Sequence, residues 1–439
     1  MWEKPEIDRH LLGRFQINNE ELSGDIIYNK ERGTIFLSIT KGLHRECGHS
    51  FSSMPSISGK LDSGAIVTLY HAACIKNHIQ NFAYQKLLFH ADYMVFGKKT
   101  GLFNSLTCVL ENALQWGAMS RIDTDGIDNF SFKSLEKQRF HWFDADICFS
   151  TTLLNELGQS PRKEVARVVE RLTVEIKSDQ KQNVPYFMKI RDKIISLISF
   201  AIKDNVNIEK QTLVDFDDFE TFNNHTYYQK YELISGEPQY NILGTGYLDY
   251  NFLLPKLSDS ATIQCTLIKL EPIFNLYLSL VKYPHMPMEM VFLNIVQALE
   301  TFHARFRYDK KDKFIESVHQ RFESCENFEE IKSLLLNKTQ LDNNINYIIL
   351  VSRLNDLLIG KNDGLFSAYY LAQSNYAQRI ADTRHYYTHY GQSKEEKAFK
   401  GDDLLRAILI MRYLLEYSIC QELGIDILES IRRQLLLLK

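Results

Sequence analysis

Short apolar runs separated by turn residues dominate the first part of the chain. From about residue 10 to residue 180, runs rich in β-branched and aromatic residues recur, and Gly, Asn, Asp and Ser interrupt them. This spacing is typical of antiparallel strands rather than of alternating strands and helices. It predicts an antiparallel β domain, folded as a sandwich or a strongly curved sheet, with strands at GRFQI, SGDIIYN, GTIFLSIT, GAIVTLYHAACI, KLLFHADYMVFG, QRFHWFDADICFS and RVVERLTVEI.

A helical period replaces the strand pattern after Pro185. Apolar residues then recur at intervals of three and four, and proline is favoured in the first turn of a helix. We expect this helix to pack on the sheet through Phe187, Ile190, Ile194, Leu197, Ile198 and Ala201. The stretch from 215 to 250 is polar, aromatic and rich in turn residues, which predicts a connection and permits a hairpin.

Amphipathic helices account for most of the remaining chain. One apolar stripe follows Pro284 and Pro287, and further helices are expected at FEEIKSLLLN and at LDNNINYIILVSRLNDLLIG, which closes at Gly360. A later stripe is expected to run through to Gly391, and the last helix has acidic residues at its start and Gly424 past its end. The three stripes are Phe292, Ile295, Leu299, Phe302 and Phe306; Phe366, Tyr370, Ala377 and Ile380; and Leu404, Leu405, Ile408, Leu415, Ile419 and Leu423.

These patterns predict an α+β protein with two domains. An antiparallel β-rich N-terminal domain followed by a helix and connecting segments is expected over 1–280, and an all-α helical bundle over 281–439.

Composition and charge narrow the class of protein. The 439 residues carry a formal net charge of -4, which argues against a surface coated with basic residues for indiscriminate nucleic-acid binding. The start of the chain lacks the apolar core of a signal peptide, and charged residues interrupt the most apolar stretches. The seven cysteines are scattered and never form a C-x-x-C pair, which fits reduced thiols. We therefore expect a cytoplasmic protein without a membrane segment.

The segment QRIADTRHYYTHYGQ, residues 378–392, carries an arginine and two histidines on a helix that otherwise shows an apolar stripe. At about 100° per residue, Arg384 falls on the stripe of Phe366 and Ile380, so its guanidinium is expected to face the bundle or a subunit interface. His389 lies about 140° further round the helix. For both residues to act on one substrate, the helix must end or unwind between them, or the two must come from different subunits. Gly391 favours an end nearby.

These residues carry a resemblance to a known family. The sequence RHYYTH, from Arg384 to His389, resembles the R-x4-6-H signature of HEPN domains, although His385 stands where that signature usually has a polar residue, most often Asn. Three segments, FLNIVQALETFHARF with Glu300, ADTRHYYTHYG and LLRAILIMRYLLEYSICQELGI, resemble successive helices of the Apea-like HEPN family. GRFQINNEELSGDIIY and GAIVTLYHAAC similarly resemble the ApeA-type N-terminal domain that accompanies it.

This resemblance implies a metal-independent endoribonuclease of bacterial antiviral defence that acts by abortive infection. His389 would accept the proton of the RNA 2′-hydroxyl, and Arg384 would neutralise the charge that develops on the phosphate, leaving a 2′,3′-cyclic phosphate. No metal or other cofactor is implied. RNA would be the substrate, a homodimer through the C-terminal HEPN-like bundle would complete the site, and the N-terminal domain would sense a phage protein as the trigger.

Neighbouring residues are candidates for supporting roles. We expect His385 to give a supporting hydrogen bond, with plain exposure as the alternative. We expect Glu300 to orient Arg384 or His389, with a solvated or salt-bridged helix edge as the alternative. Tyr386, Tyr387 and Tyr390 are candidates to stack on RNA bases, with packing as their alternative. His303 lies on an apolar stripe and is expected to be buried and hydrogen-bonded. For Arg384 and His389 themselves, the alternative is a structural ion pair or cap at a helix end.

Two metal sites and a binding function compete with the nuclease interpretation. On an unbroken helix, Asp382, His385 and His389 share a polar face with a spacing that can hold a divalent metal. The chain contains no Walker A loop, G-x-S-x-G elbow or dinucleotide fingerprint. A HEPN-type bundle that only binds a nucleotide or a partner protein is the alternative outside catalysis. The second metal candidate is a zinc site drawn from His44, Cys47, His49, His71, Cys74 and His78.

Overall fold

The computed structural model divides into two compact units. Contacts group Met1–Ile198 with Asn205–Gly244, and Ser199–Asp204 with Thr245–Lys439. The domain boundary between residues 280 and 281 stays a prediction. The structure describes residues 8–29, 33–42, 53–80, 84–97, 101–111, 113, 122–124, 130–132, 138–157, 166–222, 225–235, 260–283, 285–341, 348–360, 364–370 and 376–438.

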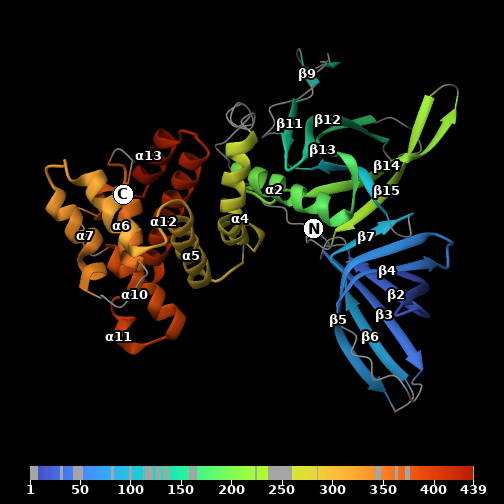
Figure 1. The fold of residues 1–439 in the computed structure, drawn as a ribbon, viewed down its shortest axis with the longest axis horizontal. Helices are drawn as coiled ribbons and strands as arrows, with labels where there is room; N and C mark the ends of the chain where they lie inside the picture. The colour runs from blue at the N-terminus through green and yellow to red at the C-terminus, as the bar shows by residue number, and fades with distance from the viewer. Residues whose placement is uncertain are drawn as a thin grey trace. The chain divides into compact units, whose positions relative to one another are not determined.

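The first six strands of the first unit form a closed barrel (Figure 1). Closure arises because β5 pairs with β4 on one side and with β6 on the other. Buried residues alternate along the strands, and Phe15, Ile26, Leu37, Leu69 and Phe89 fill the interior. The strands are β1 (Arg9–Ile17), β2 (Glu20–Asn29), β3 (Thr34–Gly42), β4 (Met54–Leu61), β5 (Ile66–Gln80) and β6 (Tyr84–His90).

A glycine allows two of these strands to approach closely. A Cβ on Gly13 of β1 would lie 2.6 Å from the carbonyl oxygen of Lys60 on β4. Any larger residue at position 13 would therefore push the two strands apart at the point where they pair.

The remaining strands of the first unit extend the same sheet in the order β11-β12-β13-β8-β14-β15-β7. They are β7 (Tyr93–Phe96), β8 (Phe103–Leu110), β11 (Gln138–Trp142), β12 (Ala145–Leu157), β13 (Ala166–Gln182), β14 (Ile208–Phe222) and β15 (His225–Ser235), and β9 (Ile122–Thr124) pairs separately with β10 (Phe130–Phe132). The expected connection over 215–250 is thus partly wrong. Its hairpin is present, but β14 and β15 are long strands of the sheet whose exposed, polar outer halves gave no apolar alternation.

Helix α2 (Val184–Ile202) packs on this sheet, as its apolar period predicts. Phe187, Ile190 and Ile194 are buried, and the buried guanidinium of Arg191 donates a hydrogen bond to the side chain of Gln211 on β14, at 2.9 Å. A buried arginine needs such an acceptor because desolvation of its charge is costly.

The second unit is helical (Figure 1), and α5 (Met288–Phe306) contacts α4, α8, α10 and α12. The predicted stripe Phe292, Ile295, Leu299 and Phe302 is buried. The other helices are α4 (Ser260–Lys282), α6 (Lys311–Phe322), α7 (Phe328–Leu341), α8 (Leu350–Ile359), α9 (Ser367–Tyr370), α10 (Tyr376–His389), α11 (Gln392–Glu395), α12 (Gly401–Glu422) and α13 (Leu428–Leu436). None of the described helices is both long and apolar enough to span a membrane.

The predicted fold class is therefore confirmed: an antiparallel β-rich N-terminal part is followed by helices and an all-α C-terminal bundle. Helix α12 also ends as expected, with Asp402 and Asp403 in its first turn and Gly424 in the left-handed region, at φ +68°, just past its end.

Candidate functional site

Arg384 and His389 lie on one unbroken helix, α10. The helix continues to His389, after which Tyr390 adopts a left-handed conformation with φ +50°. The helix end that Gly391 indicates is therefore present, but it comes after His389 and not between the two residues. Within one chain, Arg384 and His389 leave the helix axis about 140° apart, because five residues separate them.

Arg384 does not lie on the buried stripe of α10, and this expectation is wrong. The buried positions include Tyr376, Ala377, Ile380 and Thr383, whereas the Arg384 side chain is 38% exposed. The expectation rested on one straight helix from Phe366, which precedes α9, to Arg384.

The guanidinium of Arg384 is held at its inner side by α5. Its Nη2 donates a hydrogen bond to Gln297 Oε1 at 3.4 Å and lies 3.3 Å from Glu300 Oε2. The Glu300 Oε2 atom is buried and makes no hydrogen bond within the described structure, so it is in charge contact with Arg384 without hydrogen-bond geometry. The structure thus brings Arg384 and Glu300 together in an ion pair, a contact that both an orienting role and a structural salt bridge predict.

His385 and His389 occupy the exposed face of α10, with their ring centroids 4.8 Å apart. Asp382 does not join them. Its side chain is buried, and its Oδ1 accepts hydrogen bonds from Lys394 at 2.6 Å and from Gln378 at 3.1 Å. In the described part of the chain, no three His, Cys, Asp or Glu side chains are grouped to hold a metal ion.

The zinc candidate is only partly visible. His71 contacts the carboxylate of Asp92 at 3.2 Å, and the Cys74 thiol faces the carbonyl oxygen of Lys76. His78 is described and exposed. The other three candidates, His44, Cys47 and His49, lie outside the described residues.

The three tyrosines of the motif differ in exposure. Tyr387 is half-buried, donates a hydrogen bond to the carbonyl oxygen of Phe399 at 2.9 Å, and has a pKa raised mainly by burial. Tyr386 packs against Tyr387 on one side and Tyr390 on the other. Tyr390 is 67% exposed, so it has the ring face most open to a ligand.

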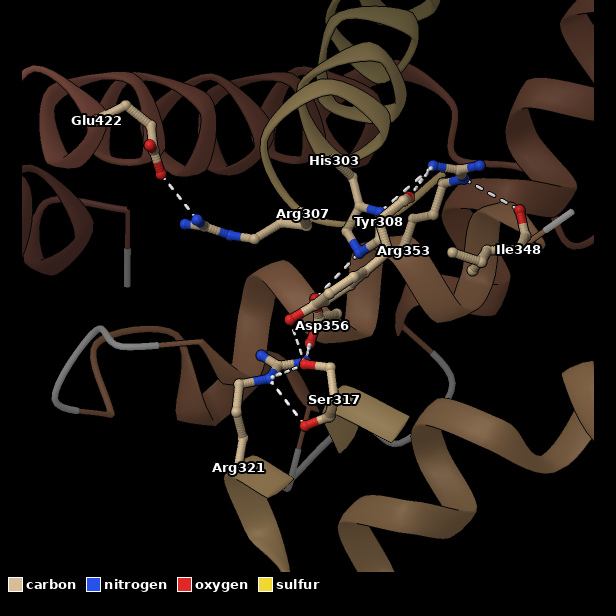
Figure 2. Close-up of polar contacts among 9 residues, drawn as sticks. All are labelled: His303, Arg307, Tyr308, Ser317, Arg321, Ile348, Arg353, Asp356 and Glu422. Atoms are coloured by element: carbon tan, nitrogen blue, oxygen red, sulfur yellow. Dashed lines mark hydrogen bonds and ion pairs between the residues drawn. The ribbon is translucent and has the colours of Figure 1, made fainter. Parts of the chain in front are cut away.

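A second polar cluster lies around the C-terminal end of α5 (Figure 2). As expected, His303 is buried and hydrogen-bonded: its Nε2 donates to Asp356 Oδ2 at 3.0 Å, and Arg353 lies 3.3 Å from its Nδ1. Burial lowers the pKa of His303, so its ring is neutral. Arg321 donates to the other oxygen of Asp356 at 2.7 Å. Sequence analysis did not identify this cluster, although Arg353 and Asp356, charged residues three apart within an apolar run, are a signal for it.

A cavity of about 710 Å³ opens beside this cluster, and Arg307, Arg321, Asp356 and Glu422 are among the residues that line it. Four of the charged residues that line it form two ion pairs. Arg307 pairs with Glu422 at 2.7 Å, and Arg321 pairs with Asp356. These ion pairs join the residue after α5 to α12, and α6 to α8.

Two parts of the sequence match known families. Residues 10–261 match the family described as ApeA N-terminal domain 1, and residues 293–427 match the family described as Apea-like HEPN. Comparison with curated proteins and with solved structures gave no match.

Proposed function

The chain belongs to the ApeA family, in which an ApeA N-terminal domain 1 precedes an Apea-like HEPN domain, and from this premise we propose that it is a metal-independent endoribonuclease. The family is one of HEPN nucleases in antiphage defence. We propose that this member acts by abortive infection: it cuts RNA in the infected cell, and growth stops before the phage multiplies.

The observation that supports the proposal most directly is the placement of Arg384. A partly exposed guanidinium, anchored from behind by Glu300, shares an unbroken helix with an exposed histidine at that helix's end. An anchored arginine at a surface is suited to bind a phosphate group, since its orientation is fixed before the ligand arrives.

The chemistry needs only groups that RNA and the protein supply. His389, in its neutral form, accepts the proton of the 2′-hydroxyl while the 2′-oxygen bonds to the adjacent phosphorus. The bond from phosphorus to the 5′-oxygen breaks, and a second, protonated histidine gives a proton to that oxygen. Arg384 donates hydrogen bonds to the phosphate oxygens as their charge increases. The products are a 2′,3′-cyclic phosphate and a 5′-hydroxyl.

A homodimer through the C-terminal bundle completes this site. Because Arg384 and His389 diverge on one helix, and because the chain carries one such motif, we place two copies of α10 face to face. One His389 then acts as the base and the partner's His389 acts as the acid. In this arrangement His385, 4.8 Å from His389 between ring centroids, supports that ring, and Tyr386, Tyr387 and Tyr390 bind RNA, with Tyr390 as the main stacking surface.

The N-terminal part, residues 1–280 in our proposal, senses the trigger. A phage protein is the proposed ligand of this β-rich domain, and the helical domain, residues 281–439, responds to it. The cytoplasm is the proposed location, because both the RNA and the newly made phage proteins are present there.

Incubation of the purified protein with total cellular RNA, with and without EDTA, tests the proposal when an extract of phage-infected cells is added as the source of the trigger and the same extract without the protein serves as the control. We expect cleavage that EDTA does not reduce, with cyclic phosphate ends at the cut sites in end mapping. Loss of cleavage on chelation, restored by one metal ion, would refute the metal-independent mechanism. Absence of any cleavage with RNA and trigger present would favour a bundle that only binds a nucleotide or a partner protein.

A further inference from the structure

Two side chains of α5 hold the same nitrogen of Arg384. Gln297 Oε1 accepts a hydrogen bond from Nη2 at 3.4 Å, and Glu300 Oε2 lies 3.3 Å from that nitrogen. Residues three apart lie on the same face of a helix, so Gln297 and Glu300 approach the guanidinium together. No role in the site follows from the sequence motif for Gln297, which is an exposed residue at the edge of the apolar stripe.

The backbone beneath Gln297 is firmly fixed. Val296 and Ala298, its neighbours in the chain, are fully buried, and so is Leu299. Gln297 therefore presents its amide from a rigid helix rather than from a loop, which is the condition for a side chain to position another group accurately.

The contacts with α5 leave the rest of the guanidinium available. Arginine has five N–H donors and no acceptor, and both α5 contacts are made to Nη2. Within the described part of the chain, Nε and Nη1 of Arg384 make no hydrogen bond. Their N–H groups can therefore donate to phosphate oxygens without breaking the contacts that hold the side chain.

Gln297 and Glu300 both contact Arg384 but differ in charge. Glu300 carries a negative charge, which compensates that of Arg384, whereas the amide of Gln297 accepts a hydrogen bond without adding charge. A second carboxylate at position 297 would largely cancel the positive charge that the phosphate needs. A neutral acceptor fixes the direction of the guanidinium and leaves its attraction for RNA intact.

We propose that Gln297 is a positioning residue of the endoribonuclease site: it holds Nη2 of Arg384 so that Nε and Nη1 face the scissile phosphate. This inference rests on the proposed function, because it assigns Gln297 a role through Arg384. Gln297 itself takes no part in proton transfer.

Three substitutions in the full-length protein test the inference, with a fluorescent RNA oligonucleotide that the wild-type protein cuts as the substrate. Gln297→Met keeps the length of the side chain but removes the acceptor, and we expect kcat to fall about tenfold with KM nearly unchanged. Gln297→Glu restores an acceptor but adds charge, so kcat should largely recover while KM rises about tenfold at low salt. Gln320→Met is the matched control and should leave both constants unchanged, because Gln320 is exposed on α6 and bonds Glu316 in its own helix.

A double-mutant cycle with Arg384→Lys shows whether Gln297 acts through Arg384. If it does, adding Gln297→Met to Arg384→Lys should change kcat less than twofold, because lysine lacks the nitrogen that Gln297 holds. A wild-type kcat for Gln297→Met, a loss that follows the folded fraction in thermal melts, or full additivity in the cycle would each overturn the inference. If Arg384→Ala and His389→Ala abolish cleavage while Gln297→Met resembles Gln320→Met, the proposed function stands and only the role of Gln297 is wrong. Undiminished cleavage by Arg384→Ala would instead refute the proposed site itself.

Discussion

At the scale of single residues, Arg384 and His389 differ in how firmly the protein holds them. Arg384 is fixed by acceptors on α5, whereas His389 is exposed at the last position of α10 and contacts His385. A proton acceptor at a helix end contributes little to the core, so its removal should affect chemistry more than stability. Substitutions of the two residues should therefore differ in how strongly they change the cleavage rate and the melting temperature.

His389→Ala should lower the rate of RNA cleavage by a factor on the order of 10²–10⁴, the usual contribution of a general acid or base. Its melting temperature and its dimer should stay close to those of the wild type, because the exposed ring packs against little. Cleavage rates on the same RNA, together with thermal melts, check this prediction. Arg384→Lys is the companion variant: it keeps the charge but loses the planar fork, so its activity should also fall strongly.

A structural role for the pair predicts the opposite pattern. Both variants would then melt at lower temperature, and their residual activity would follow the folded fraction. Two stable, dimeric variants that cut RNA at the wild-type rate would show that Arg384 and His389 are not the active site.

The sequence predicts some of these residue contacts and misses others for clear reasons. His303 as a buried, hydrogen-bonded residue follows from its place on an apolar stripe. Glu300 was a candidate to orient Arg384 or His389, and the structure places it against Arg384, although its role there stays a prediction. Gln297 was missed because an exposed glutamine leaves no periodic signal. Only the packing of α5 against α10 brings it to Arg384.

At the scale of elements, polar contacts join α5 to three neighbouring helices. Gln297 and Glu300, near the middle of α5, contact α10, while His303 in its last turn contacts α8 and Arg307, the residue after the helix, contacts α12. The orientation of Arg384 therefore depends on the position of α5, which the contacts with α8 and α12 help to fix. The pair of His303 and Asp356 is the most buried of these contacts. Protonation of either side chain should therefore change the free energy of unfolding measurably.

Stability should decrease as the pH falls below 6.5, the ordinary pKa of histidine. Burial lowers the pKa of His303, so the unfolded chain takes up a proton more readily than the folded chain. Burial raises the pKa of Asp356, but the hydrogen bond from His303 and the charge of Arg321 outweigh it, and its pKa is lowered. For both groups, the contribution to the free energy of unfolding is full at pH values above the pKa in the unfolded chain. It is lost as the pH falls from that pKa through the lower pKa in the folded protein.

His303→Gln isolates the histidine contribution. The amide can still donate to Asp356, but it replaces a buried ring that also contacts Arg353 and Phe314, so the variant should be less stable than the wild type at neutral pH, by about 1–3 kcal/mol. Because the amide does not titrate, the melting temperature of the variant should depend less on pH below 6.5, and the two proteins should converge in acid. Melting curves across this range check the prediction, and parallel pH profiles would contradict it.

Local pattern identified some elements better than others. Helices with a clean apolar period, such as α2, α5 and α12, were predicted near their observed bounds. The expected helices did not include α4, α6 or α13. In α6 and α13 the apolar residues do recur at helical spacing, but both helices are short and mostly polar, and each buries only a few residues. Short apolar stripes of this kind are easily overlooked beside the long stripes of α2 and α5.

At the scale of the whole molecule, the fold class could be predicted but the closure of the barrel could not. Alternating short runs indicate a curved antiparallel sheet, and β1 to β6 form one. Its closure depends on two pairings between strands that are far apart in the chain, β1 with β4 and β3 with β6. Local alternation is the same in an open sheet and a closed barrel, so the sequence alone did not distinguish them.

The proposed dimer makes a quantitative prediction for mixtures of active and inactive subunits. If one catalytic site uses His389 from both subunits, a dimer of one wild-type and one His389→Ala chain lacks either its acid or its base. Activity should then follow the square of the wild-type fraction: equal amounts of the two chains should leave about a quarter of the activity, compared with about half for independent sites. Co-expression with two different tags, followed by cleavage assays at several ratios, checks this. The subunits must exchange or assemble together, which double-tag purification verifies. A linear dependence on the wild-type fraction would show that each chain carries a complete site, and the face-to-face arrangement of α10 would be wrong.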